Sequence, residues 1–167
     1  VVSLAAPSNI SAKFIEGIAQ GMNALAKAYG VSMVGGDTVR AMRIVINVAL
    51  LGRVKKEEVV YRSGARKGDI IFVTGALGNS LKTQKHLQFR PRVAEARFAV
   101  TQAKPHAMMD VSDGLAGDLG HVLRESKVGA VIEEARIPLA KGASLQQALH
   151  DGEDFELVMT VPPERAD

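Results

Sequence analysis

The sequence predicts an α/β or α+β fold with mixed sheets flanked by helices, because two kinds of apolar pattern alternate along the chain. One pattern repeats every three to four residues and predicts a helix after Ser11. Its apolar positions are Phe14, Ile18, Met22, Leu25 and Tyr29. The other pattern is a short apolar run beside glycine or charged residues, which predicts strands. With 47% hydrophobic and 23% charged residues, the composition is that of a globular protein with a substantial core.

The first part of the chain is predicted to form a strand, a helix and two further strands. Residues 1–4 have the pattern of a strand already under way, and residues 7–9 are expected to turn. Ser11 can cap the helix at its start, and Gly30 ends it. The two later strands are expected at residues 31–34 and 43–53.

A polar loop at residues 62–69 is the predicted domain boundary, which divides the chain into domains 1–61 and 62–167. The second domain is expected to contain three strands, at residues 70–74, 128–133 and 155–161, and two helices, at residues 92–102 and 113–126. The second of these helices has one apolar face, formed by Leu115, Leu119, Val122 and Leu123.

Charge and composition exclude several classes of function. A net charge of +3, from 21 basic and 18 acidic residues, is too even to indicate nucleic acid or a membrane surface as a partner. The absence of cysteine excludes disulfides and thiolate zinc sites and favours a cytoplasmic location. The longest apolar run, residues 44–51, is too short to span a bilayer. The four histidines lack metal-ligand spacing and are expected to be structural or exposed.

Two acidic motifs carry the strongest functional signal. They are Gly35-Gly36-Asp37-Thr38 and Asp110-Val111-Ser112-Asp113-Gly114, and each follows a short apolar run. Glycines beside carboxylates at strand ends let the backbone turn sharply and leave the carboxylates exposed. Hard oxygen ligands of this kind suit Mg²⁺, which usually arrives with a substrate phosphate. The motifs therefore predict a site for a magnesium nucleotide.

Each motif also has a plain structural interpretation. The Gly-Gly-Asp-Thr segment is typical of a tight turn, and Ser112 or Asp113 can cap the helix that follows. Residues 152–156, Gly-Glu-Asp-Phe-Glu, fit an exposed turn before a strand. The segment Arg90-Pro91-Arg92, together with Arg97, fits a solvated helix start or a phosphate contact.

The order and flanks of the motifs resemble the thiamine-monophosphate kinase family, in the superfamily of aminoimidazole ribonucleotide synthetase. The matching stretches are spread over nearly the whole chain: residues 29–38, 62–69, 110–115 with 118–119, 137–139, and 152–157 with 160–163. The resemblance implies the two-domain fold of that superfamily. Residues 1–61 would be the remainder of an N-terminal domain that binds ATP and metal and dimerises. Residues 62–167 would be a truncated C-terminal α/β domain.

The resemblance also implies an activity and its ligands. Such kinases transfer the γ-phosphoryl group of ATP to the phosphate of thiamine monophosphate, giving thiamine diphosphate, and act as homodimers with several Mg²⁺ ions. The implied metal ligands are Asp37, Asp110 and Asp113. The implied nucleotide contacts are Gly36, Asp37, Arg62 and Ser112, and the implied contact with thiamine monophosphate is Glu153. No further catalytic residue is assigned, because catalysis of phosphoryl transfer is almost entirely positioning and electrostatics.

The sequence departs from the family pattern at several points. The acidic segments that precede this region in the family are absent, and Gly78-Asn79-Ser80 replaces Gly-Asp-Ser. His150-Asp151-Gly152 stands where Gly-Gly is usual, and the stretches at 81–89 and 141–149 look short. We therefore expect a fragment that lacks the N-terminal segment and the C-terminal end. The alternatives are a selenophosphate or aminoimidazole ribonucleotide synthetase, a non-catalytic nucleotide-binding module, or a plain α/β interaction domain.

Two expectations concern geometry. Asp37, Asp110 and Asp113 should converge on the metal, within one subunit or across a dimer. The strand expected at 43–53 is apolar on both faces, which predicts burial on both sides. We expect a partner subunit to supply part of that burial; the alternative is an ordinary central strand within one subunit.

Overall fold

The computed structural model describes residues 1–166, which form two compact units, Val1–Arg53 and the unit that begins at Val54. This division lies eight residues before the boundary expected from the sequence, at the start of the segment that leads into the polar loop. Each unit has its own sheet, and each is described by itself.

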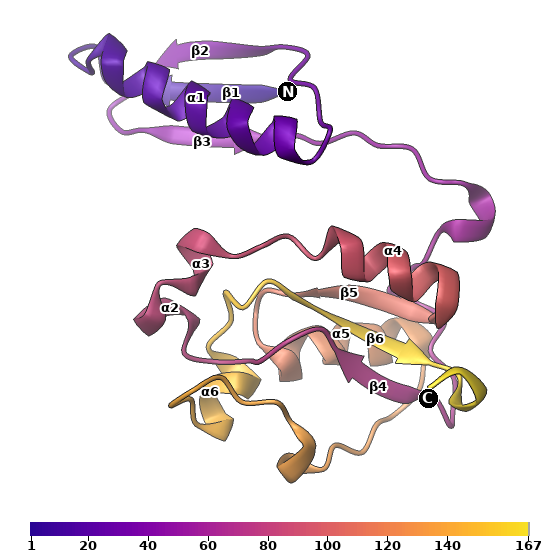
Figure 1. The fold of residues 1–167 in the computed structure, drawn as a ribbon. Helices are drawn as coiled ribbons and strands as arrows, with labels where there is room; N and C mark the ends of the chain where they lie inside the picture. The colour runs from indigo at the N-terminus through magenta and orange to yellow at the C-terminus, as the bar shows by residue number, and fades with distance from the viewer. Residues whose placement is uncertain (167) are drawn as a thin grey trace. The chain divides into compact units, whose positions relative to one another are not determined.

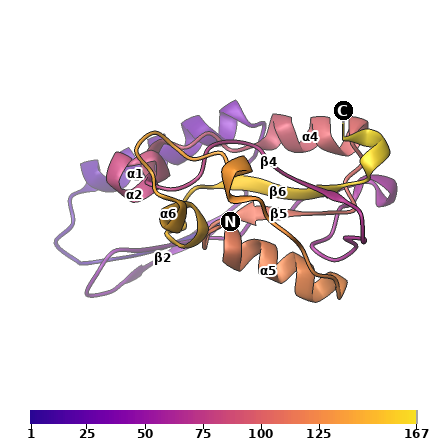
Figure 2. The same ribbon diagram turned by 90° about the horizontal axis from the view of Figure 1, so that it is seen from below.

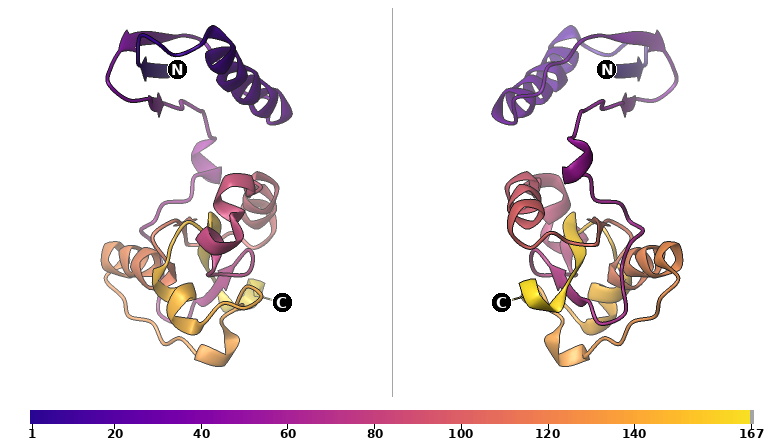
Figure 3. Two further views of the ribbon diagram at one scale, coloured as in Figure 1. Left: turned by 90° about the vertical axis from the view of Figure 1, so that its left-hand side faces the viewer. Right: turned by 90° about the vertical axis from the view of Figure 1, so that its right-hand side faces the viewer.

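The N-terminal unit is a three-stranded sheet with one helix. Its elements are β1 (Val2–Ala6), α1 (Ala12–Ala28), β2 (Gly36–Arg40) and β3 (Val45–Val48). The strand order is β2-β1-β3, with β1 parallel to β2 and antiparallel to β3. Figures 1 and 3 show α1 running alongside this sheet. The predicted cap is confirmed, because the Ser11 side chain accepts a hydrogen bond from the backbone N–H of Phe14.

Two strand predictions in this unit are wrong. Residues 31–34 form no strand, and the pairing with β1 begins at Gly36, so that the Gly-Gly-Asp-Thr motif enters the strand and is not the turn after it. The absence of a side chain at Gly36 permits this, since a Cβ there would collide with the backbone oxygen of Val2. The strand expected at 43–53 is also shorter, because only Val45–Val48 pairs with β1, and all four residues are exposed.

The C-terminal unit has three layers. Its sheet contains β4 (Ile70–Val73), β5 (Ala107–Val111) and β6 (Glu156–Val161) in the order β4-β6-β5, with both pairings antiparallel. Figure 2 shows α4 (Val93–Gln102) on one side of the sheet and α5 (Leu115–Ser126) on the other. Short helices complete the unit: α2 (Ser80–Thr83), α3 (Lys85–Gln88) and α6 (Leu145–His150), with single 3₁₀ turns η1 (Lys56–Glu58), η2 (Glu134–Arg136) and η3 (Pro163–Arg165).

Alternation along β6 supplies both faces of the core. Val158 packs with Val111 of β5 and Leu119 of α5 in the larger cluster, whereas Met159 and Val161 pack with Ala99 of α4 in the smaller one. Successive side chains of a strand point to opposite faces, so one central strand can serve two layers.

The strand expected at residues 128–133 is not formed. This segment runs without regular structure into η2, and Val131 is 92% exposed. Apolar, β-branched residues alone do not make a strand where no neighbouring strand pairs with them. Within the described residues, no helix is long and apolar enough to cross a membrane.

Candidate active site at one end of the C-terminal sheet

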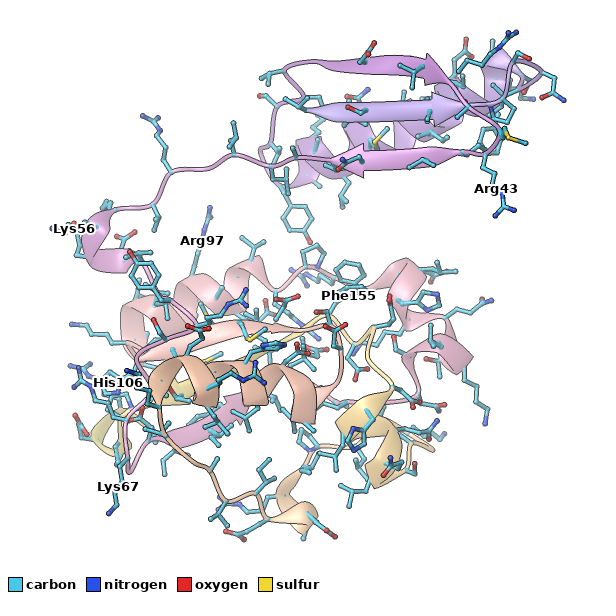
Figure 4. All side chains as sticks on the ribbon, turned by 180° about the vertical axis from the view of Figure 1, so that it is seen from behind. Arg43, Lys56, Lys67, Arg97, His106 and Phe155 are labelled. Carbon is cyan, nitrogen blue, oxygen red and sulfur yellow. The ribbon has the colours of Figure 1, made fainter. Side chains whose placement is uncertain are left out.

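Three loops meet at one end of the C-terminal sheet. Because β6 is antiparallel to both of its neighbours, β4 and β5 end where β6 begins. The loop after β4 (residues 74–80), the loop after β5 (residues 112–114) and the loop before β6 (residues 151–155) therefore lie together. Figure 4 shows Phe155, from the last of these, at the opposite end of the unit from His106 and Lys67.

Hydrogen bonds join the three loops directly. The backbone N–H of Glu153 donates to the Ser112 oxygen at 2.7 Å, and that of Phe155 donates to the Val111 oxygen at 2.9 Å. The Ser80 hydroxyl donates to the Glu153 backbone oxygen at 2.6 Å. Gly152 fits because it has no side chain: a Cβ there would lie 2.5 Å from the Ser112 oxygen. The segment that carries Glu153 is thus fixed against the segment that carries Ser112 and Asp113.

Asp118 organises the loop after β5. It is buried on the first turn of α5, and its Oδ2 accepts hydrogen bonds from the backbone N–H groups of Ser112 (2.8 Å) and Asp113 (2.9 Å). Burial raises the pKa of Asp118, these two hydrogen bonds oppose the rise, and the nearby charges of Asp113 and Asp110 add to it. The three carboxylates therefore share one end of β5, two of them exposed and one turned inward.

A buried ion-pair network supports the loop before β6. The Glu156 carboxylate, 1% exposed, accepts from Arg92 Nε at 2.6 Å and Nη2 at 2.7 Å, from Lys85 Nζ at 2.8 Å and from the Thr74 hydroxyl at 2.7 Å. Burial alone raises the pKa of Glu156, but the hydrogen bonds from Arg92, Lys85 and Thr74 outweigh it and lower the pKa to about 2. The interpretation of Arg92 as a solvated helix start or a phosphate contact is wrong, because its guanidinium is committed to Glu156 and Glu95.

The structure brings some of the predicted site residues together. Ser112, Asp113 and Glu153 lie on hydrogen-bonded segments, and Asp110 is the exposed penultimate residue of β5. Arg62 is also exposed, but it flanks the start of β5, where the oxygen of Tyr61 accepts from Met108 N–H at 3.0 Å. Its role as a nucleotide contact stays a prediction.

Gly36 and Asp37 belong to the other unit. Asp37 is exposed, and its Oδ1 accepts a hydrogen bond from the backbone N–H of Thr38 at 2.8 Å. The glycine at position 36 has a local reason, the close approach of β1, besides the nucleotide contact expected for it. The convergence of Asp37 with Asp110 and Asp113 stays a prediction.

The exposed carboxylate oxygens of the candidate site are suitable ligands for a hard cation that is bound together with phosphate. Among residues 1–166, no group of three or more Asp, Glu or His side chains is close enough to hold a metal ion by itself. Asp110, near the end of β5, and Asp113, in the loop that follows, nevertheless have exposed side chains, while the Asp118 carboxylate accepts hydrogen bonds from backbone N–H groups. Mg²⁺ is commonly held by one or two carboxylates, with waters and substrate phosphates as its other ligands.

Comparisons with known proteins identify the family. Residues 1–54 match the family described as AIR synthase related protein, N-terminal domain, and residues 56–167 match AIR synthase related protein, C-terminal domain. The chain belongs to this family of AIR synthase related proteins, and the predicted fold class is confirmed.

The chain is similar to thiamine-monophosphate kinases over nearly its whole length. The enzyme of Rhodopirellula baltica is 36% identical over 99% of this chain and 55% of its own length. That of Bacillus subtilis is 34% identical over 98% of this chain and 59% of its own. The resemblance recognised from the motifs is confirmed. The chain spans little more than half the length of these relatives.

Solved structures agree. The structure of AaThiL complexed with AMPPCP and TMP matches with a TM-score of 0.85 at 27% identity, covering 100% of this chain and 62% of that one. Escherichia coli HypE, a hydrogenase maturation protein, matches with a TM-score of 0.81 at only 18% identity, over 99% of this chain and 58% of that one. The second match shows the fold alone, so the function must be argued from the site.

Proposed function

We propose that the protein containing this chain is a thiamine-phosphate kinase, which transfers the γ-phosphoryl group of ATP to the phosphate of thiamine monophosphate. The carrying observation is the direct hydrogen bond from Glu153 N–H to the Ser112 oxygen, which joins the proposed acceptor segment to the proposed metal and nucleotide segment. The relatives from Rhodopirellula baltica and Bacillus subtilis, which match 99% and 98% of the chain, are thiamine-monophosphate kinases.

In this proposal, the exposed carboxylates bind the metal ions. Asp37, Asp110 and Asp113 would hold Mg²⁺, which would supply positive charge next to the ATP phosphates. The triphosphate of ATP and the phosphate of the acceptor repel each other, and bound cations would offset this repulsion as the acceptor oxygen approaches the γ-phosphorus. The bond from the γ-phosphorus to the bridging oxygen of ADP breaks as the new P–O bond forms, giving ADP and thiamine diphosphate.

The remaining proposed contacts orient the two substrates. Ser112, Gly36 and Arg62 would contact the nucleotide, Arg62 as a permanently charged planar fork on phosphate. Glu153, exposed at the tip of its loop, would pair with the cationic thiazolium or accept from the aminopyrimidine NH₂. Since ATP is the phosphoryl donor, we place the reaction in the cytoplasm.

We also propose a homodimer. β3 is exposed along its whole length, with Val45 56% and Val48 52% exposed, and Leu51 just beyond it is 97% exposed. An apolar strand edge of this kind calls for a covering partner. A second copy of the chain would supply it, and the metal site could then draw Asp37 from one subunit and Asp110 with Asp113 from the other.

The direct test is product analysis on the full-length protein. With ATP, Mg²⁺ and thiamine monophosphate, we expect ADP and thiamine diphosphate in equal amounts, and no product after chelation of the metal. Release of inorganic phosphate with selenide or a formylglycinamidine ribonucleotide as co-substrate would favour a synthetase of the same superfamily. ATP binding without turnover on any acceptor would favour a non-catalytic nucleotide-binding module.

A further inference from the structure

The loop that carries Glu153 has an unusual backbone. Glu153 and Phe155 are not glycines, yet their φ angles are +60° and +50°. Such left-handed conformations are strained for residues with a side chain, and they persist only where the surrounding structure holds them in place. Strained residues gather at functional sites, so the contacts that hold this loop bear on its function.

Two of those contacts come from the end of β5, where the Ser112 and Val111 oxygens accept hydrogen bonds from the N–H groups of Glu153 and Phe155. The third comes from Ser80, the first residue of the short helix α2, whose hydroxyl donates to the Glu153 backbone oxygen at 2.6 Å. Ser80 is 0% exposed, so no water can substitute for this hydrogen bond from the solvent side. A matching bond runs the other way: Gly78 N–H donates to Oδ2 of the fully buried Asp154 at 2.7 Å.

These bonds fix the backbone of Glu153 on both sides. Its N–H is held by Ser112, its carbonyl by Ser80, and the next side chain, Asp154, by Gly78. The Glu153 side chain itself is exposed. A long side chain that starts from a fixed backbone loses less freedom when it meets a ligand, which strengthens binding.

We propose that Ser80 is a positioning residue, which aims the Glu153 carboxylate at the acceptor substrate by holding the Glu153 carbonyl. This inference rests on the proposed function, in which Glu153 contacts thiamine monophosphate. Ser80 acts through Glu153 and touches neither substrate. Its effect should therefore appear in the binding of the acceptor and not of ATP.

The same short helix offers a matched control. The Thr83 hydroxyl donates to the backbone oxygens of Asn79 (2.9 Å) and Ser80 (3.3 Å), within α2 and its cap, and makes no bond to the loop before β6. Thr83→Ala removes a hydroxyl from α2 without releasing Glu153. Ser80→Cys keeps a weak donor of similar size and should restore part of the lost effect.

The test is a double-mutant cycle on the full-length protein, with KM measured for both substrates. Ser80→Ala should raise KM for thiamine monophosphate about fivefold, the usual value of one hydrogen bond, and leave KM for ATP within about twofold. Ser80→Cys should lie between Ser80→Ala and the wild type, and Thr83→Ala should match the wild type. In a Glu153→Ala background, Ser80→Ala should cause no further rise, because residues that act through one another are not additive.

Several results would overturn the inference. If the fold-increases in KM caused by Ser80→Ala and Glu153→Ala multiply in the double variant, the two effects are independent and Ser80 does not position Glu153. The same conclusion follows if Ser80→Ala leaves KM for thiamine monophosphate unchanged while Glu153→Ala raises it. If Ser80→Ala does not fold, the same cycle with Ser80→Cys decides in the same way. If Glu153→Ala leaves KM for thiamine monophosphate unchanged, or if the wild type makes no thiamine diphosphate, the proposed roles fail first and the inference with them.

Discussion

The two units of the chain differ in how far they bury their apolar residues. The C-terminal unit covers both faces of its sheet and buries Val111, Leu119 and Val158 almost completely. Among residues 1–53, all of which the structure describes, the buried hydrophobic residues are Leu4 and Ala6, and β3 is exposed throughout. One unit has a substantial core of its own, whereas the other leaves the apolar residues of β3 exposed.

The carboxylates of the C-terminal unit divide in a similar way. Asp118, Asp154 and Glu156 are buried and bound to backbone N–H groups or to cationic side chains. Asp110, Asp113 and Glu153 lie at the same end of the sheet but are exposed. The inner set thus supports this end of the sheet, and the outer set is the one that we propose meets ligands.

The largest effect on stability is expected at Glu156. Glu156→Ala removes the buried carboxylate that Arg92 and Lys85 share and leaves them with Glu95 and, at 4.0 Å, Asp154, which should cost about 3 kcal/mol of unfolding free energy. Glu133→Ala is the control, because the Glu133 side chain is 68% exposed and its Oε1 lies 3.6 Å from Arg136 Nη1 in a loose surface ion pair. It should change the free energy of unfolding by less than about 0.5 kcal/mol. Urea unfolding of the full-length proteins measures both, and similar small losses would contradict the account of the buried network.

The same carboxylate predicts a dependence on pH. The folded pKa of Glu156 is lowered from 4.5 to about 2, so its contribution is present above pH 4.5 and is lost as the pH falls toward 2. The shift corresponds to about 3 kcal/mol at 1.36 kcal/mol per unit. Burial raises the pKa of Asp118 and Asp154, which acts in the opposite direction, so the difference between wild type and Glu156→Gln isolates the effect. That difference in unfolding free energy should shrink between pH 5 and pH 2, and a constant difference would refute the shift.

A matched pair of valines compares the two units directly. Val158 is 0% exposed and Val48 is 52% exposed. Val158→Ala should cost about 2 kcal/mol through the cavity it leaves, whereas Val48→Ala should cost less than about 0.5 kcal/mol in the unfolding of a subunit.

Val48→Ala should act instead on self-association. If a second copy covers β3, the variant should weaken the dimer several-fold in sedimentation at falling concentration, with Val158→Ala much less effective. A wild-type protein that sediments as a monomer at micromolar concentration would remove the dimer and the idea that Asp37 acts across an interface.

Local patterns in the sequence predicted the elements that depend on nearby residues. The helix after Ser11, the helix that follows the Asp110–Asp113 motif and the strand over residues 155–161 are present, because caps and periodicity are short-range signals. Residues 31–34 and 128–133 have strand-like composition, but pairing partners decide strands, and composition does not reveal them.

The supporting residues of the site could not be found in the same way. Arg92 and Glu156 lie 64 residues apart, Gly78 and Asp154 lie 76 apart, and Ser80 and Glu153 lie 73 apart. Nothing near Arg92 in the sequence signals a buried partner, so it resembled a solvated helix start. The exposed Asp110, Asp113 and Glu153 were found because they stand beside glycines at the ends of elements, where sharp turns present them. Their burial classes and hydrogen-bonded neighbours required the structure.

The central claim is that the exposed carboxylates at the end of the C-terminal sheet hold magnesium for phosphoryl transfer and do not hold the fold. The most direct measurement is the rate of thiamine diphosphate formation by full-length Asp113→Asn, at saturating thiamine monophosphate and subsaturating Mg²⁺-ATP. The account predicts a fall of roughly ten- to a hundredfold, the value of a charged contact worth about 1.5–3 kcal/mol, with the urea midpoint unchanged. A rate within twofold of the wild type, in a variant as stable as the wild type, would contradict it.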